Sequence, residues 1–315
     1  MGRAELIEAT RATLTKAGYE VSSALNLRSI CFDLVARRDE KLLIIKILIN
    51  VDAFSKDNAE EMKVLAEALS ASPMLLGERS SSGVLESGIV YSRFDIPIIS
   101  NETLSDHMIE EVPPLIFTAP GGMYVKLDNE LLKEIREGNG ISLGSLAQIA
   151  GVSRRTIQMY EAGMGAMIDA ALRIEEFLNT PIILPLDPLE YRPEVPAERY
   201  EFSGTERTGS SVLNKLLDIG FSVTPVMKSP FDALSRADEA LILTGTGEDE
   251  DRLVQRALIA SDVSRLAGKP SVVIVKHSNS RDRIRTTAVI SVEELDKIEE
   301  SDELTEMVLS RSTKR

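Results

Sequence analysis

The side chains best suited to chemistry lie in one short segment, SRRTIQM, which runs from Ser153 to Met159. Arginine can donate two hydrogen bonds to guanine, glutamine can pair with adenine, and threonine or methionine can touch a thymine methyl group or a phosphate. The side chains expected to face outward and contact double-stranded DNA are Ser153, Arg154, Arg155, Thr156, Gln158 and Met159. We expect Arg154, Arg155 and Gln158 to read base edges. Thr156 would touch the DNA backbone or a methyl group.

Two short helices around a tight turn would hold this segment in place. Ser142 is a good N-cap for the first helix, and Ser153 is a good N-cap for the second, which we expect from Arg154 to Glu161. Gly151 lies between them, where a residue with positive φ is needed and glycine adopts it most easily. The small Ala147 falls where the two helices cross. The spacing therefore predicts a helix-turn-helix motif.

Further amphipathic segments extend this motif into a helical module. Asp128 can cap a helix from Asn129 to Glu137, and Asp169 can cap a helix that follows the motif. The apolar residues expected in that last helix are Leu172, Ile174, Phe177 and Leu178. The whole order, roughly from Lys126 to Ile183, resembles the five-helix repressor domains of the Cro/C1 family, also described as Xre-like.

The resemblance rests on a small residue, a turn glycine and a buried isoleucine at Ala147, Gly151 and Ile157. It implies sequence-specific binding to DNA. One departure concerns the start of the first motif helix, where the family often has a glutamine that anchors a phosphate. Leu143 and Gly144 stand there instead, so a side-chain phosphate contact at that point is in doubt.

Charge limits how this module can bind. The chain has a net charge of -14, which argues against broad, nonspecific binding to nucleic acid or to anionic membranes. The module itself carries more acids than bases, so a single copy would bind DNA weakly and a homodimer would supply the missing affinity. The alternative is a helical hairpin whose arginines are only solvated.

Prolines mark the boundaries of the module. Pro113 and Pro114 precede it, and four prolines from Pro185 to Pro196 follow it. With 315 residues, the chain is long enough for three domains, which we expect at residues 1–115, 124–184 and 200–315.

The two outer segments are similar to each other. FDLVARRDEKLLI, from Phe32 to Ile44, aligns without a gap with FDALSRADEALIL, from Phe231 to Leu243, and shorter similarities precede and follow this match. Each segment predicts the order helix, strand, strand, strand, helix, strand. In the first copy these elements are expected at 4–16, 19–23, 30–37, 41–49, 57–70 and 73–76. The order predicts a duplicated mixed sheet with helices on both faces.

This order resembles the restriction-endonuclease-like fold of Holliday-junction resolvases. The expected fold class is therefore α/β plus all-α: a five-helix Cro/C1-type domain between two related mixed-sheet domains. The nuclease family needs an aspartate on one hairpin strand and an acid-x-lysine triplet on the next, because two carboxylates hold a divalent ion. Asp33 and Lys46 stand at matching places, but Ile44 replaces the second acid.

The second copy keeps Asp232 and has Leu243 and Gly245 in place of the acid and the lysine. Both copies are therefore predicted to lack catalytic residues, a metal site and a cofactor, so that the chain is not an enzyme. Asp33 would then bond to backbone or pair with Arg37 or Arg38. The alternative is a second carboxylate from the first helix, at Glu5 or Glu8.

Other features place the chain in a broad class. The single cysteine, Cys31, excludes an internal disulfide and fits a reducing cytoplasm. Two histidines and one cysteine are too few for an ordinary structural zinc site. The most apolar run, Leu42 to Ile49, is far too short to span a membrane. We therefore expect a cytoplasmic protein without membrane contact.

The preferred hypothesis is a sequence-specific transcriptional regulator. Over its whole length the chain resembles a family of archaeal Cro/C1-type regulatory proteins, which implies DNA binding and a role in transcription. The two flanking α/β domains would provide dimerisation, contacts with a partner such as the transcription machinery, or ligand sensing. Two alternatives remain open. One is a metal-dependent nuclease or resolvase that its helix-turn-helix delivers to DNA. The other is an interaction platform for transcription proteins that does not bind DNA.

Overall fold

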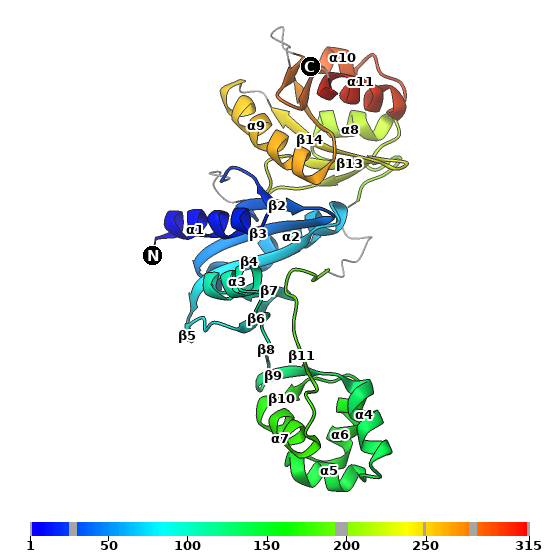
Figure 1. Cartoon of the computed structure of the whole chain (residues 1–315). Coiled ribbons are helices and arrows are strands. Elements are labelled where there is room, and N and C mark those ends of the chain that lie inside the picture. Colours follow the sequence, from blue (N-terminus) through cyan, green and yellow to red (C-terminus); the bar gives the residue numbers. More distant parts are fainter. Residues whose placement is uncertain (1, 25–29, 193–200, 248–249, 277–281, 314–315) are drawn as a thin grey trace. The chain divides into compact units, whose positions relative to one another are not determined.

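The computed structural model describes residues 2–24, 30–192, 201–247, 250–276 and 282–313 (Figure 1). The chain divides into two compact units, each built from separate stretches. The first unit contains Met1–Ala17, Leu48–Ala53 and Met74–Tyr191. The second contains the remaining stretches, Gly18–Ile47, Phe54–Pro73 and Arg192–Arg315.

The second unit contains an N-terminal hairpin and a C-terminal α/β domain. Its elements are β1 (Glu20–Val21), β2 (Leu34–Arg38), β3 (Lys41–Asn50), α2 (Lys56–Ala68), α8 (Ser211–Asp218), β12 (Ser222–Pro225), β13 (Ala233–Ala237), β14 (Ala240–Gly247), α9 (Glu250–Ala267), β15 (Ser271–Val275), β16 (Arg283–Ile284), β17 (Thr287–Ser291), α10 (Val292–Leu295) and α11 (Ser301–Thr313). The last residues of β3 pass into the first unit.

The C-terminal strands form one mixed sheet in the order β12-β13-β14-β15-β17-β16. Strands β14, β15 and β17 are parallel, whereas β12, β13 and β16 pair antiparallel with their neighbours. Alternate side chains of a strand point to opposite faces. Val272 and Ile274 pack with α8, α10 and α11, while Val273 and Val275 pack with α9. The helices therefore cover both faces, as predicted (Figure 1).

The N-terminal hairpin joins β2 to β3 through a tight turn. Strands β1, β2 and β3 are successive antiparallel neighbours, and Asp39 in the turn has a positive φ of 54°. Six consecutive residues of β3, from Leu42 to Ile47, are buried. A strand buried on both faces explains why this run is apolar without alternation. The hairpin and its turn were predicted, although β2 begins at Leu34 rather than at Ile30.

The first unit contains the remaining elements. They are α1 (Arg3–Lys16), the short 3-10 helix η1 (Val51–Ala53), β4 (Ser72–Ser80), β5 (Gly83–Val84), β6 (Ile89–Arg93), β7 (Ile96–Ile99), α3 (Asn101–Ile109), β8 (Ile116–Ala119), β9 (Gly122–Leu127), α4 (Asn129–Gly138), α5 (Leu143–Ala150), α6 (Arg154–Glu161), β10 (Ala166–Met167), α7 (Ile168–Leu178) and β11 (Ile183–Leu184).

The two α/β segments follow the same order along the chain. The first reads α1-β1-β2-β3-α2-β4 and the second reads α8-β12-β13-β14-α9-β15, as predicted. The correspondence continues beyond the predicted elements. Strand β7 is parallel to β4 and antiparallel to β6, just as β17 is parallel to β15 and antiparallel to β16. A serine caps the helix that follows each of β7 and β17: Ser100 directly after β7 and Ser291 at the end of β17.

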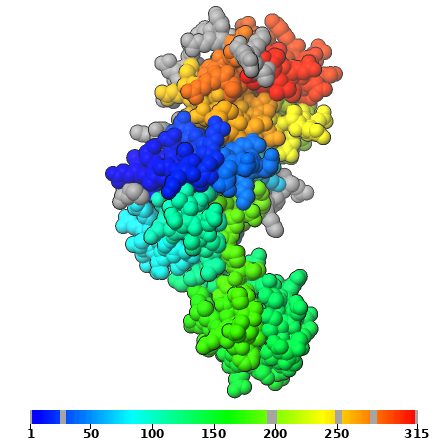
Figure 2. Space-filling view, in the orientation of Figure 1, coloured from blue at the N-terminus to red at the C-terminus, as the bar shows by residue number. Residues whose placement is uncertain are grey.

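Residues 124–184 fold around the helices α4 to α7 and the small strands β9 to β11. Strand β9 pairs with both β10 and β11, so the beginning and the end of this helical module are joined by backbone hydrogen bonds. Its core includes Leu132, Leu146, Ile157 and Ile174, all fully buried. In the space-filling view the side chains of this segment form one continuous surface on the visible face (Figure 2).

Two expectations for this module were wrong. It has four helices rather than five. Asp169 does not cap α7: the N-cap is Met167, and Asp169 lies in the first turn. Of the apolar residues expected on the last helix, Leu172 and Phe177 are 51% and 47% exposed.

Candidate nucleic-acid interface

Each helix of the predicted motif begins at a serine that caps its first turn. Ser142 Oγ accepts a hydrogen bond from the backbone N–H of Ser145 at 3.0 Å, and Ser153 Oγ accepts one from Thr156 at 3.1 Å. Such a cap stabilises a helix by about 1 kcal/mol. Between the helices Gly151 has a φ of 69°, the left-handed conformation that favours glycine. Helices α5 and α6 begin and end where the sequence predicts.

The inner side of α6 is fixed by packing against the core. Ile157 is fully buried and Tyr160 is 2% exposed, one helical turn apart. The backbone N–H of Val152 donates to the carbonyl of Ala147 at 3.0 Å, which ties the turn to the end of α5. Ala147 is 4% exposed, so a larger side chain there would push the helices apart. These contacts leave the opposite side of α6 facing solvent.

The predicted DNA-contact residues lie on this outer side. Five of them are exposed: Ser153, Arg154, Arg155, Gln158 and Met159. Thr156 is only partly exposed, and its hydroxyl lies 2.8 Å from Ser153 Oγ. Within the described part of the chain, the side chains of Arg154, Arg155 and Gln158 make no hydrogen bond or ion pair. Their donors therefore remain available for a ligand.

The acid at the end of α6 is neutralised within the module. Arg136 Nε lies 2.5 Å from Glu161 Oε1, and both side chains are almost buried, at 11% and 10% exposure. The hydrogen bond to Glu161 raises the pKa of the Arg136 guanidinium above its usual value. Glu161 is the acid closest along the chain to the exposed cations of α6. Because Arg136 compensates its charge, Glu161 opposes an approaching phosphate less than a free carboxylate would.

Two arginines of the module lie against glycines. A Cβ atom on Gly144 would be 2.8 Å from Arg154 Nε, and one on Gly151 would be 2.6 Å from Arg173 Nη1. Arg173 also donates from Nε to the carbonyl of Asp169 at 3.0 Å. The absence of a Cβ at these two glycines therefore makes room for the guanidinium groups.

The candidate nuclease residues form a buried ion pair. Asp33 is 1% exposed, and Lys46 Nζ lies 3.3 Å from its Oδ1 and donates to the Ile30 carbonyl at 2.7 Å. The backbone N–H of Ile47 donates to Asp33 Oδ2 at 2.8 Å. The expected backbone bond is thus present, but the cation is Lys46 rather than Arg37 or Arg38. The side chain of Ile44 is fully buried and offers no ligand.

The second copy repeats this arrangement with another cation. The backbone N–H of Thr246 donates to Asp232 Oδ2 at 2.6 Å, and Arg256 from α9 lies 2.6 Å from Asp232 Oδ1. Gly245 stands where the first copy has Lys46, so Arg256 supplies the positive charge. In both copies the aspartate bonds to backbone and to a basic side chain.

These residues do not fit the divalent metal ion that nucleases of this fold use. A magnesium site needs several oxygen ligands, whereas both oxygens of Asp33 bond to protein donors and the second acid is missing. Across the described ranges, no three His, Cys, Asp or Glu side chains gather into a metal-binding group. None of the helices described there combines the length and the apolar character of a membrane span.

Comparison with known proteins supports the assignment of both parts. Residues 3–114 match a PD-(D/E)XK superfamily domain, and residues 132–184 match a helix-turn-helix domain. Curated proteins of Methanocella arvoryzae, Halorubrum lacusprofundi and Natronomonas pharaonis are 39%, 39% and 38% identical to the chain. The matches cover at least 99% of this chain and 98% of each relative. All three relatives are named "Putative HTH-type transcriptional regulatory protein".

The chain belongs to this family of archaeal HTH-type transcriptional regulatory proteins. The superfamily match at residues 3–114 agrees with the predicted nuclease-like fold of that segment. No solved structure matches the chain.

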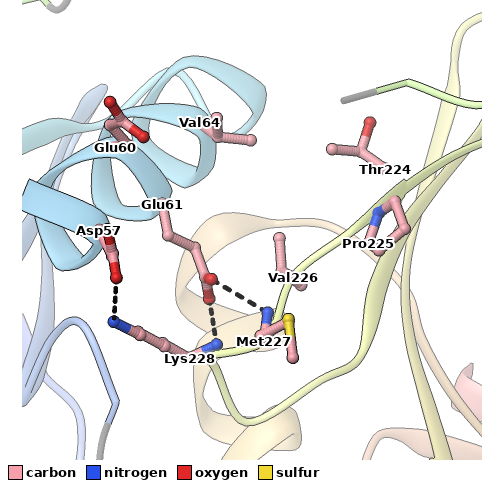
Figure 3. Close-up of a pocket in the computed structure, with 9 residues that line it drawn as sticks. All are labelled: Asp57, Glu60, Glu61, Val64, Thr224, Pro225, Val226, Met227 and Lys228. Carbon is pink, nitrogen blue, oxygen red and sulfur yellow. Dashed lines mark hydrogen bonds and ion pairs between the residues drawn. The ribbon is translucent and has the colours of Figure 1, made fainter. Parts of the chain in front are cut away.

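This HTH-type regulatory protein also has a groove in its second unit, of about 290 Å³ (Figure 3). The lining residues are Asp57, Glu60, Glu61, Val64, Thr224, Pro225, Val226, Met227 and Lys228. The carboxylate of Glu61 accepts hydrogen bonds from the backbone N–H groups of Met227, at 3.0 Å, and Lys228. Burial raises the pKa of Glu61, and Lys228 Nζ lies 3.7 Å from Asp57. These bonds make Glu61 a structural link rather than a metal ligand.

Sequence reasoning for this family member missed the two arginine–glycine contacts. The only signal in the sequence was the departure at Leu143 and Gly144, where the Cro/C1 pattern often has a glutamine. Nothing in the spacing of Arg173 indicates that it lies against Gly151, because α7 reaches the turn only through tertiary packing.

Proposed function

We propose that this family member is a sequence-specific DNA-binding protein that regulates transcription. The observation that carries the proposal is the exposed side of α6, where the side chains of Arg154, Arg155 and Gln158 make no hydrogen bond or ion pair with the residues described. Long basic and amide side chains on a helix that is fixed only at its back suit insertion into a major groove. The DNA-contact surface comprises Ser153, Arg154, Arg155, Thr156, Gln158 and Met159.

The residues of the DNA-contact surface have different roles in this proposal. Ser153 fixes the first turn of α6 through its bond to Thr156, so that the side chains that follow start from a rigid backbone. Arg155 and Gln158 are three residues apart and therefore lie on the same side of the helix. This spacing lets them reach neighbouring base pairs, where arginine favours guanine and glutamine favours adenine. Met159 adds an apolar contact.

We further propose that the chain works as a homodimer of three-domain subunits, divided at residues 1–115, 124–184 and 200–315. The helical module has more acidic than basic residues, so one copy would hold DNA weakly. Two copies on adjacent half-sites would add their contacts, with a spacing of one helical turn of DNA or a multiple of it. The two α/β domains, which share one strand order, serve as a duplicated scaffold without catalytic activity.

Selection of bound sequences from a pool of random duplexes tests the DNA-binding proposal. The wild-type protein should enrich one sequence, and Arg155→Ala and Gln158→Ala should each relax the preference at one position of that sequence. Removal of one base-reading side chain should reduce discrimination by about 1–3 kcal/mol. Arg79→Ala removes another exposed arginine, on β4, and should leave the selected sequence unchanged. Unchanged preference in both α6 variants would remove the assigned roles.

A further inference from the structure

The first two arginines of α6 are not equivalent. Both are exposed, but the guanidinium group of Arg154 lies beside Gly144 of α5. A Cβ atom at Gly144 would be 2.8 Å from Arg154 Nε, 2.9 Å from Nη2 and 3.1 Å from Cζ. Cζ is the most distant of the three atoms, so the guanidinium group approaches the glycine with its Nε–Nη2 edge rather than with its face. Arg155 follows about 100° further around the helix.

The contact places the charge of Arg154 on the first helix of the motif. When a helix-turn-helix docks on DNA, the second helix enters the major groove and the first helix crosses the sugar-phosphate backbone. A guanidinium group that lies beside α5 is therefore placed near the DNA backbone, and Arg154 is the arginine of α6 found in this position. Arginine binds a phosphate with two parallel hydrogen bonds, and its orientation matters for this geometry.

On the basis of the proposed DNA binding, we propose that Arg154 binds a backbone phosphate rather than a base and that Gly144 is its positioning residue. Base reading is then left to Arg155 and Gln158. The assignment also accounts for the departure at the start of α5: the side chain of Leu143 offers no hydrogen-bond donor for a phosphate, and Arg154 brings a side-chain donor to the same helix from α6.

The identity of residue 144 supports this assignment. Gly144 lies in the first turn of α5, where the backbone is helical and alanine would be the better helix former. The space that a Cβ would fill is occupied by the guanidinium of Arg154. Alanine at this position would displace the flexible end of Arg154 and leave the helix itself intact.

Two binding measurements separate a phosphate contact from a base contact. For Arg154→Ala, affinity should fall about ten-fold or more, equally for the selected duplex and for duplexes with single base-pair changes. The slope of log affinity against log salt concentration should become shallower by about 0.9 for each phosphate that the variant no longer neutralises. For Arg155→Ala, by contrast, the loss of affinity should be concentrated at one base pair.

Gly144→Ala tests the positioning role. It should reproduce the uniform loss of affinity and the shallower salt dependence of Arg154→Ala, while its melting temperature stays equal to that of wild type or rises. The double variant should bind no more weakly than Arg154→Ala alone. Gly138→Ala, in α4, is the matched control because nothing lies within 4 Å of its new Cβ, and it should leave binding unchanged.

Two outcomes would overturn the inference while DNA binding stands. One is a relaxed preference at a single base pair in Arg154→Ala. The other is an unchanged salt dependence in Gly144→Ala. A wild-type protein that binds no duplex would instead remove the proposed function together with this inference.

Discussion

Asp33 and Asp232 occupy equivalent positions in the two α/β segments and make the same backbone bond. Each accepts a hydrogen bond from the N–H group fourteen residues further along, Ile47 or Thr246, at 2.8 and 2.6 Å. Their own N–H groups also donate to equivalent carbonyls, of Ile45 and Thr244. An aspartate that would hold a metal ion in a nuclease thus joins two strands in both copies.

The first prediction compares the loss of these two aspartates. Asp33→Ala leaves the ammonium group of Lys46 buried without its counter-ion, so the free energy of unfolding should fall by about 3–5 kcal/mol. Asp232→Ala should cost less, because Asp232 and Arg256 are 30% and 31% exposed and water screens their pair. Urea unfolding followed by circular dichroism measures both. Equal losses in the two variants would contradict the expectation that burial of the ion pair determines the size of the loss.

The second prediction concerns magnesium. With one engaged carboxylate and Ile44 in place of the second acid, the described residues around Asp33 offer no set of oxygen ligands. Millimolar Mg²⁺ should therefore neither raise the melting temperature nor produce cleavage of duplexes or branched DNA. Cleavage that requires Mg²⁺ and disappears in Asp33→Asn would contradict this and would establish a nuclease.

The third prediction compares two glycines of the helical module. Gly151→Ala should destabilise the module by about 1–2 kcal/mol, because its φ of 69° is unfavourable for alanine. Its Cβ would also lie 2.6 Å from Arg173. Gly138→Ala should stabilise the module by up to about 1 kcal/mol, since alanine is the better helix former. Thermal unfolding of the two variants gives the sign, and a stabilising Gly151→Ala would refute the assigned turn geometry.

The fourth prediction is a pH dependence in the C-terminal domain. The hydrogen bond from Arg311, 2.6 Å from Glu294, lowers the pKa of Glu294 to about 2. A carboxylate whose pKa is lower in the folded state stabilises the fold above its unfolded pKa and loses this effect as pH falls. The stability difference between wild type and Glu294→Gln should therefore be present at pH 6 and shrink between about pH 4.5 and pH 2.

Glu293→Gln serves as the control for this experiment, because Glu293 is the exposed neighbour of Glu294. Its stability should follow that of wild type across the same pH range. A difference between wild type and Glu294→Gln that does not change with pH would show that the ion pair with Arg311 does not stabilise the charged form.

Local signals predicted the motif well. The bounds of α5 and α6 follow from Ser142, Gly151 and Ser153, whose effects act within one turn of the chain. The same reasoning failed at Asp169, because an acid is favourable anywhere in the first turn of a helix and so does not identify the cap. A cap and a first-turn residue differ by backbone conformation, which the residue type alone does not reveal.

Long-range contacts were less predictable. Strand β10 owes its existence to pairing between Ala166 and Val125, far apart in the sequence, and a pair of residues carries no periodicity of its own. The exposure of Leu172 and Phe177 has a similar cause, since only the packing of α7 decides which of its apolar residues meet the core. The charged partner of Asp33 was likewise not predictable from its neighbours in the sequence, because Lys46 lies on the next strand.

The buried ammonium group of Lys46 has a further consequence for the fold. A metalloenzyme binds its cation from the surrounding solution. Here the cation is a side chain of the protein itself, because Lys46 Nζ lies 3.3 Å from Asp33 Oδ1. We therefore expect chelating agents to leave the fold of this segment intact.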